Sequence, residues 1–298
     1  MAVSTRSRRT ERLPSWLRRR IPRLDECSPV ETVVNKYNLH TVCREALCPN
    51  RAECYSKGKV TFMILGDICT RSCRFCAVRK GVPKAPDADE PRRVAAAAAK
   101  LGLKQVIVTS VTRDDLPDGG ASVFASVIKE LKKLDPSPIV EVLVPDFMGD
   151  TEALRIVLDA GPDIFSHNIE TTERLYGKLR RNADYHRSLE LLRESKVIRK
   201  EVMTKSAMIL GMGETYDEII DVLKDLGDVD CDFVAIGQYL QPTSRQIPVA
   251  SYIHPDLFAE IESRAYEIGF LEVNAGPLVR SSYMENNPYH YRTKLGAG

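Results

Sequence analysis

The chain has 298 residues, of which 43% are hydrophobic and 28% are charged; this composition is typical of a folded enzyme and too apolar for a disordered chain. No run of eighteen apolar residues occurs, so the sequence predicts no membrane-spanning segment. The net charge is +2, but residues 1–23 carry eight arginines against the single Glu11, and the remainder holds 35 basic and 40 acidic residues. Because the body is not basic, we expect no nucleic acid partner.

The Arg-rich start is also typical of mitochondrial transit peptides, but Pro14, Trp16 and Pro22 would interrupt an amphipathic helix. We interpret residues 1–23 as an arm that either contacts an acidic partner or is a solvated tail. The chain has eight cysteines and no apolar signal segment. This combination argues against a secreted disulfide framework and indicates a reducing compartment and bound metal.

Three cysteines, Cys43, Cys48 and Cys54, follow the arm with four and five residues between them; we call them the first triad. Three thiolates are one fewer than the four that a closed [4Fe–4S] cluster takes from protein. A fourth ligand would come from elsewhere in the chain. Cys27 and Cys231 are candidates, but each stands alone in the sequence, and a buried or incidental thiol is the preferred interpretation of both.

Residues 60–65 form an apolar run with β-branched residues, and Gly66 follows it, which predicts a strand. A polar loop follows with Cys69, Cys73 and Cys76, the second triad, and a cluster held by three cysteines keeps one iron open for a small molecule. Zinc is the alternative, but a structural zinc site needs a fourth Cys or His at paired spacing, and none follows Cys76. The two triads therefore predict two separate clusters, with one shared site of six thiolates as the remaining alternative.

After the second triad, β-branched and amphipathic segments alternate. Strands are predicted at residues 105–110, 138–144, 164–168, 203–210, 233–237 and 270–274, and helices at residues 91–101, 120–134, 151–159, 183–195, 215–226 and 255–268. With the strand at 60–65 this gives six strand–helix units and a last strand, which implies a parallel sheet with right-handed crossovers. Six units are too few for a closed eight-fold barrel, so we expect an open, curved partial barrel.

Polar residues gather where the predicted strands end. Thr109 and Ser110 end one strand, Asn168 and Glu170 follow another next to His167, and a glycine-containing run at 211–214 follows a third. In a parallel sheet these ends share the edge at which ligands bind. Polar turn residues explain any one of these loops, but three of them beside a cysteine loop predict a polar small-molecule site.

The spacing of Cys69, Cys73 and Cys76, with Phe75 before the last cysteine, resembles the signature of radical S-adenosylmethionine (SAM) enzymes, which fold as six-unit partial barrels. Within that superfamily the first triad resembles the auxiliary-cluster motif of the lipoyl synthase family. Residues 279–283, Val-Arg-Ser-Ser-Tyr, resemble that family's C-terminal serine motif. The resemblance covers most of the chain, including residues 113–120, 167–170 and 238–242, and the two triads together with the serine motif are its most specific part.

The resemblance implies an α/β fold, a partial (βα)6 barrel of the radical SAM type with N- and C-terminal extensions. The implied organisation is an N-terminal arm and auxiliary-cluster segment at residues 1–58, the barrel at 59–275, and a C-terminal segment with a serine cluster ligand at 276–298. The second triad would hold the [4Fe–4S] cluster that binds SAM. The first triad and a serine oxygen would hold an auxiliary [4Fe–4S] cluster; Ser282 is the preferred ligand and Ser281 the alternative.

The implied activity is lipoyl synthesis: a 5′-deoxyadenosyl radical from SAM takes hydrogen from an octanoyl chain on a carrier-protein lysine, and the auxiliary cluster supplies sulfur at carbons 6 and 8. The expected SAM-binding residues are Thr109, Ser110, Asn168 and Glu170, with Arg180 for the carboxylate because a guanidinium fork matches its shape. The expected partners are an octanoylated lipoyl domain or the glycine cleavage H protein, an electron donor such as ferredoxin or flavodoxin, and an iron–sulfur carrier. We expect a cytoplasmic location, because the arm matches the family's mature start near Trp16.

Two other functions are weighed against this one. The first is another radical SAM sulfur-inserting or methylthiotransferase enzyme that acts on a small molecule or tRNA, although the chain has no appended basic domain for tRNA. The second is an iron–sulfur electron-transfer or scaffold protein, which would need neither open iron sites nor six strand–helix units. Cleavage of SAM under reducing conditions separates this carrier from both enzymes.

Overall fold

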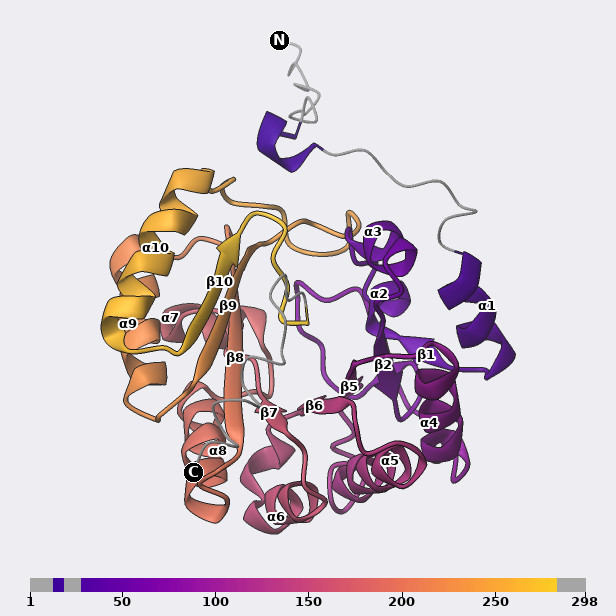
Figure 1. Cartoon of the computed structure of the whole chain (residues 1–298). Coiled ribbons are helices and arrows are strands. Elements are labelled where there is room, and N and C mark those ends of the chain that lie inside the picture. The colour runs from indigo at the N-terminus through magenta and orange to yellow at the C-terminus, as the bar shows by residue number, and fades with distance from the viewer. Residues whose placement is uncertain (1–12, 19–27, 283–298) are drawn as a thin grey trace.

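The structure, a computed structural model, describes residues 13–18 and 28–282. One curved sheet organises it, with the strand order β1-β2-β5-β6-β7-β8-β9-β10 (Figure 1). β1 is antiparallel to β2, and all other neighbours in this sheet are parallel. The strands are β1 (His40–Thr41), β2 (Thr61–Ile64), β5 (Gln105–Ser110), β6 (Ile139–Leu143), β7 (Ile164–Ser166), β8 (Met203–Leu210), β9 (Phe233–Gln238) and β10 (Glu272–Gly276). A separate parallel pair, β3 (Ile68–Cys69) and β4 (Arg79–Lys80), flanks the second triad.

Helices surround the outer side of the sheet (Figure 1). The long ones are α4 (Glu90–Lys100), α5 (Ala121–Leu134), α6 (Thr151–Asp159), α8 (Tyr185–Ile198), α9 (Tyr216–Gly227) and α10 (Pro255–Ile268). The others are α1 (Ser28–Lys36), α2 (Val42–Glu45), α3 (Arg51–Ser56) and α7 (Glu173–Leu179), with short 3-10 turns η1 (Ser15–Leu17) and η3 (Phe147–Gly149). Among the helices that the structure describes, none is long and apolar enough to cross a membrane.

The six predicted strand–helix units and the last strand are present in the predicted order. The predicted bounds of β5, α6, β8 and α10 agree with the structure, and the other predicted elements differ by one to three residues. Pro91 lies in the first turn of α4, and a capping box of Thr215 and Glu218 begins α9, so local sequence sets where these helices begin. The sheet order ends at β1 and β10, so the barrel is the open, partial one that the sequence predicts.

The structure also contains short elements that the sequence analysis did not predict. β1, α2 and α3 lie around the first triad, and α7 lies between β7 and α8. Helices of four to seven residues make too few turns for an apolar period to be recognised. β1 joins this N-terminal segment to the barrel sheet, and Val30, Val34 and Tyr55 belong to the same hydrophobic core as the barrel.

The two faces of the barrel strands have different roles, because successive side chains point to opposite sides. Side chains such as Val106 and Val108 pack in the core beneath the helices. On the other face, four neighbouring strands contribute one residue each to a separate apolar cluster: Ile139, Ile164, Met203 and Phe233. These residues begin or nearly begin their strands, so they fill the amino end of the barrel interior and leave the carboxyl end for a ligand.

Candidate active site

The second triad lies in the loop after β2, at the carboxyl edge of the sheet. Gly66 turns the chain out of the strand with φ 85°, a conformation that glycine adopts without strain. In the middle of the loop, the N–H of Arg74 donates to the carbonyl oxygen of Leu179 over 2.9 Å, and the N–H of Ile247 donates to the carbonyl oxygen of Arg74 over 3.1 Å. These bonds fasten the loop to α7 and to the segment after β9.

The thiols of the second triad lie close enough to affect one another. Burial, together with the smaller effect of charges on Cys73 and Cys69, raises the pKa of Cys76 to about 12. Burial also raises the pKa of Cys73. Buried thiols of this kind ionise when a cation lies beside them, and three converging thiolates are soft donors that suit iron. The donor set therefore fits a [4Fe–4S] cluster bound by three cysteines.

The first triad has a similar arrangement. Burial, together with the smaller effect of charges on Cys48 and Cys54, raises the pKa of Cys43 to about 12, so these thiols act on one another too. The segment is held by buried Thr41, whose hydroxyl lies 2.8 Å from that of Tyr55 and also caps α2. This donor set fits a second cluster that lacks one protein ligand.

Of the two single cysteines, Cys231 lies in the described part of the chain, away from both triads. Cys231 is buried, and its thiol donates to the carbonyl oxygen of Phe233 over 3.4 Å, at the amino end of β9. It is therefore a core thiol, as preferred from the sequence. Cys27 lies outside the described residues.

Asn168, Glu170 and Arg180 meet beyond the end of β7. The amide Nδ2 of Asn168 donates to Oε1 of Glu170 over 3.0 Å, and Nη1 of Arg180 donates to the carbonyl oxygen of Asn168 over 2.9 Å. Burial raises the pKa of Glu170, although Arg180 and Asn168 partly oppose this shift. Charges on Arg180 and Glu170 also act on Cys73. The three residues therefore lie beside the second triad.

Arg180 keeps one hydrogen-bond donor for a ligand. Its Nη1 donates to the hydroxyl of Tyr176 over 2.5 Å, and its guanidinium lies 5.0 Å from the centre of that ring. Its Nε is buried and has no hydrogen-bond acceptor in the described structure. A buried donor without a partner destabilises the protein, and a carboxylate bound beside Arg180 would satisfy it.

Thr109 and Ser110 are consecutive in β5, so their side chains point to opposite faces of the sheet. Thr109 lies opposite Leu143, on the face that carries the interior cluster with Ile139, and donates to the carbonyl oxygen of Leu143 over 2.9 Å. The hydroxyl of Ser110 is buried and has no hydrogen-bond partner among the described residues. Strand alternation therefore directs Thr109, rather than Ser110, toward the barrel interior.

The segment after β10 returns across the barrel toward α2 and α3 (Figure 1). The amide Nδ2 of Asn50, which lies between two cysteines of the first triad, donates to the carbonyl oxygen of Leu278 over 2.6 Å. The hydroxyl of Ser281 donates to Oδ1 of Asn168 over 2.8 Å. This segment therefore connects the first triad's surroundings with the residues beside the second triad, a link that the sequence analysis did not predict.

Arg71, inside the second triad, forms a buried ion network that the sequence analysis also missed. Its Nε and Nη2 donate to Asp114, each over 2.8 Å, and Nη2 also donates to Asp146 over 2.5 Å. Asp146 is fully buried and accepts a second bond from Arg187. Burial by itself raises the pKa of Asp146, but Arg71 outweighs it and holds that pKa well below its usual range. The position of Arg71 between two cysteines was the only signal in the sequence.

His167 predicts a pH dependence of stability. Its Nδ1 donates to the carbonyl oxygen of Val144 over 2.9 Å, and burial, aided by Arg180, lowers its pKa from 6.5 to about 4. A histidine with this shift stabilises the fold above its unfolded pKa, and the stabilisation is lost as the pH falls toward the folded pKa. Between pH 6 and 5 we expect the free energy of unfolding to fall by about 1.4 kcal/mol more in the unsubstituted protein than in His167→Asn.

Urea titrations at both pH values measure this difference. If the free energy of unfolding fell equally in the unsubstituted protein and in His167→Asn, His167 would not be held neutral by the fold.

Comparisons with known proteins show the family of the chain. The model of the Radical SAM superfamily matches residues 63–226. The lipoyl synthase of Caldanaerobacter subterraneus subsp. tengcongensis is 54% identical over 274 residues, which cover 92% of this chain and 96% of that protein. The lipoyl synthase of Caldicellulosiruptor bescii is 51% identical over 274 residues, which cover 92% and 94%.

A solved structure shows the same fold. Streptococcus suis SuiB bound to S-adenosylmethionine superposes with a TM-score of 0.58 at 12% identity, over 72% of this chain and 49% of that chain. A likeness at this low identity concerns the fold alone, whereas the identity to the two curated relatives extends over almost the whole sequence. The chain belongs to the lipoyl synthase family of the radical SAM superfamily.

Proposed function

We propose that the protein inserts two sulfur atoms, at carbons 6 and 8, into an octanoyl chain bound to a lysine of a lipoyl carrier protein. The observation that carries this proposal is the presence of two cysteine triads, together with one C-terminal segment that contacts Asn50 in the first triad's segment and Asn168 beside the second triad. Removal of hydrogen from a substrate needs only the cluster that cleaves SAM. A second cluster site of different spacing, joined to the first by residues 278–281, supports a second role, the supply of sulfur.

Cys69, Cys73 and Cys76 would hold one [4Fe–4S] cluster, which when bound supplies the electron that cleaves SAM into methionine and a carbon radical. The Nε of Arg180 would donate to the methionyl carboxylate. Glu170 would accept hydrogen bonds from the ribose hydroxyls or the ammonium group of SAM, in a position fixed by Asn168. Thr109 completes the proposed set from β5, whereas Ser110, whose side chain points to the opposite face of the strand, is left out of it. Because the proposed SAM-binding side chains are buried or half-buried, they would exclude water from the reacting carbon.

Cys43, Cys48 and Cys54 would hold the auxiliary [4Fe–4S] cluster together with Ser282. The hydroxyl of Ser281 is already engaged by Asn168, which supports Ser282 over Ser281 as the ligand. An oxygen ligand is harder than thiolate and suits a cluster that is taken apart during the reaction.

The proposal also names the partner proteins of the reaction and its location. The carrier is an octanoylated lipoyl domain or the glycine cleavage H protein, the electron donor is a ferredoxin or flavodoxin, and an iron–sulfur carrier restores the auxiliary cluster in the cytoplasm. The division into residues 1–58, 59–275 and 276–298 belongs to the same proposal. It is supported by β1, which adds the N-terminal segment to the edge of the barrel sheet, and by Leu278 of the C-terminal segment, which accepts a hydrogen bond from Asn50 of the N-terminal segment.

The test is an anaerobic reaction. The protein is reconstituted with iron and sulfide, its iron is counted, and it is incubated with SAM, dithionite and an octanoyl-lysine peptide. About eight irons per chain and a peptide mass that gains two sulfurs for two hydrogens are the expected results. Formation of 5′-deoxyadenosine with an unchanged peptide would replace the proposal with a radical SAM sulfur-inserting or methylthiotransferase enzyme that has another substrate.

Glu170→Gln is expected to weaken SAM binding roughly tenfold, because a hydrogen bond to a charged acceptor contributes about 1.5 kcal/mol or more. Equilibrium dialysis of SAM against the anaerobic protein measures the change. Glu173→Gln is the matched control, because Glu173 is largely exposed and pairs only with exposed His186 among the described contacts. If Glu170→Gln and Glu173→Gln bind SAM equally well, Glu170 does not belong to the site.

A further inference from the structure

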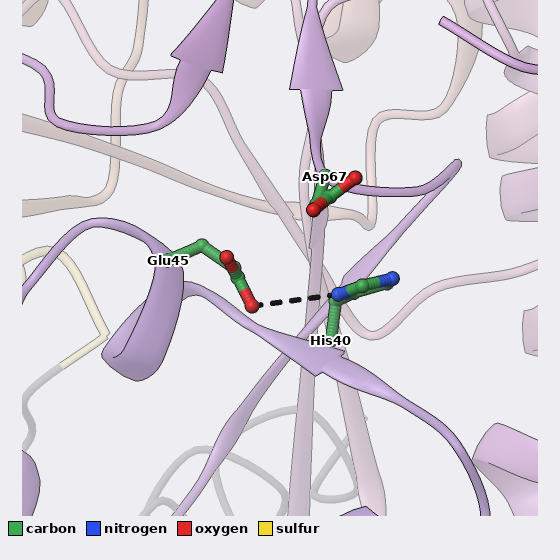
Figure 2. A group of neighbouring side chains, drawn as sticks. All are labelled: His40, Glu45 and Asp67. Carbon is green, nitrogen blue, oxygen red and sulfur yellow. Dashed lines mark hydrogen bonds and ion pairs between the residues drawn. The ribbon is translucent and has the colours of Figure 1, made fainter.

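Three side chains with metal-binding atoms converge from segments that adjoin the two cysteine triads. His40, Glu45 and Asp67 each offer one such atom, and these three atoms all lie within 4.8 Å of one another. Figure 2 shows them pointing toward one another from three separate segments: His40 from β1, Glu45 from the end of α2, and Asp67 from the turn after β2. Convergence from three segments requires the folded chain and is not a property of local sequence.

The backbone holds these side chains in place before any ion binds. His40 is paired with Met63 across the β1–β2 ladder. Thr41 directly follows His40 and caps α2 by accepting a hydrogen bond from the N–H of Arg44, which fixes the helix that carries Glu45. Ligands fixed by hydrogen bonds and sheet pairing lose little freedom when a metal binds, so the arrangement favours binding.

The contacts that His40, Glu45 and Asp67 already make satisfy only part of their hydrogen-bonding and charge-pairing capacity. Nδ1 of His40 and Oε1 of Glu45 lie 3.4 Å apart, longer than an ordinary hydrogen bond. Asp67 forms an ion pair with Arg79, whose side chain is 68% exposed and can leave. The side chains of Glu45 and Asp67 are only 20% and 17% exposed. Two largely buried carboxylates beside one imidazole therefore favour a cation that can bind all three.

The donor atoms indicate which cation fits. In tetrahedral geometry, ligand atoms about 2.1 Å from one ion lie about 3.4 Å apart. Nδ1 of His40 and Oε1 of Glu45 already lie 3.4 Å apart, and the remaining pairs, which lie within 4.8 Å, need to approach by at most about 1.4 Å. One imidazole nitrogen with two carboxylate oxygens suits Mn²⁺, Fe²⁺ and Zn²⁺, whereas Mg²⁺ and Ca²⁺ prefer oxygen alone. Three protein ligands leave the remaining positions to water.

We propose that His40, Glu45 and Asp67 bind one divalent transition-metal ion of the Mn²⁺, Fe²⁺ and Zn²⁺ group. Glu45 lies two residues after Cys43, and Asp67 lies two residues before Cys69. The ion would therefore fasten the segment of the first triad to the loop of the second. This site is separate from both cluster sites, and its existence does not depend on the proposed reaction.

Manganese titration of the fully reconstituted protein tests the site. After removal of loose metal with a chelating resin, Mn²⁺ is added anaerobically without SAM or substrate, and the electron paramagnetic resonance signal of free Mn²⁺ is followed. One ion per chain is expected. His40→Ala and Asp67→Asn are expected to weaken binding at least tenfold, whereas Arg79→Gln is expected to strengthen it several-fold, because it removes the cation that competes for Asp67.

The matched control is His186→Ala. His186 lies 2.9 Å from Glu173 in an exposed pair that belongs to no three-ligand group in the described structure, so its loss is expected to leave binding unchanged. In a second arm, ⁵⁷Fe²⁺ is added to protein whose clusters contain natural iron, and Mössbauer spectra are expected to show one high-spin ferrous ion that His40→Ala removes. Circular dichroism and cluster absorbance confirm that each variant is folded.

Two outcomes would overturn the site. One is the absence of saturable binding in both the unsubstituted protein and Arg79→Gln, which would leave an ion-pair network only. The other is binding that responds equally to His40→Ala and His186→Ala, which would mean unspecific surface binding. Because these measurements contain no SAM or octanoyl peptide, failure here and failure of lipoyl synthesis are told apart.

Discussion

Cys73→Ala is expected to reduce the rate of SAM cleavage by about a thousandfold or more. The reason is that residues which act as one unit are non-additive, so removing one ligand costs nearly as much activity as removing all three. Cys54→Ala is expected to leave cleavage within a few-fold of the unsubstituted protein and to abolish sulfur insertion. The physical reason is that each thiol pKa responds to the other thiols of the same triad: that of Cys43 to Cys48 and Cys54, and that of Cys76 to Cys73 and Cys69. Loss of one thiol is therefore expected to disable the cluster proposed for its own triad and to leave the other in place.

Chromatography of 5′-deoxyadenosine and mass analysis of the octanoyl peptide measure the two steps separately. Cys231→Ala is the control, because Cys231 is a buried core thiol at the amino end of β9 and should affect neither step. If Cys54→Ala abolished cleavage as completely as Cys73→Ala, the two triads would form one shared site of six thiolates.

Arg71→Ala is expected to lower the free energy of unfolding by about 3–5 kcal/mol, because it leaves the buried carboxylate of Asp146 with only part of its compensating charge. The second triad's loop would lose its attachment to Asp114 and Asp146, and iron should leave the protein faster under a chelator. Arg193→Ala, which removes a pair in which both side chains are about half exposed, is expected to cost under about 1 kcal/mol.

Anaerobic urea titrations of Arg71→Ala and Arg193→Ala at several pH values measure the difference. Because the pKa of Asp146 is lowered in the folded protein, its stabilisation is present above the ordinary carboxyl pKa of 3.8 and is lost as the pH falls below it. The effect of Arg71→Ala should therefore be constant near neutral pH and shrink in acid. An effect no larger than that of Arg193→Ala would mean that the network does not hold the loop.

Periodicity predicted the barrel because its elements are long enough to show a period. β5 contains the β-branched run 106–109, β8 ends in the apolar run 207–210, and α6 and α10 carry apolar residues at helical spacing. The segment between residues 28 and 58 gave no such signal. Its short helices α2 and α3 are stabilised by contacts such as the bond between Thr41 and Tyr55, not by a repeating pattern.

The candidate site was predictable only where its residues lie close together in the sequence. The two cysteine triads are each contained within a dozen residues, so spacing alone reveals them. Arg71 and Asp146 are 75 residues apart, and Ser281 and Asn168 are 113 residues apart. Nothing in one sequence shows that such residues meet. The choice between Ser281 and Ser282 likewise depends on a contact that spacing does not contain.

The hydrogen bond between Asn50 and Leu278 also bears on how the protein is made. These residues are 228 positions apart, and at about 5–20 residues per second a ribosome adds Leu278 roughly 10–50 s after Asn50. The second triad, by contrast, is complete within eight consecutive residues. A growing chain therefore carries the thiols of both triads early, but the contact of Leu278 with the first triad's segment forms only near the end of translation. The order of synthesis, and not contact strength alone, sets when the surroundings of the first triad are complete.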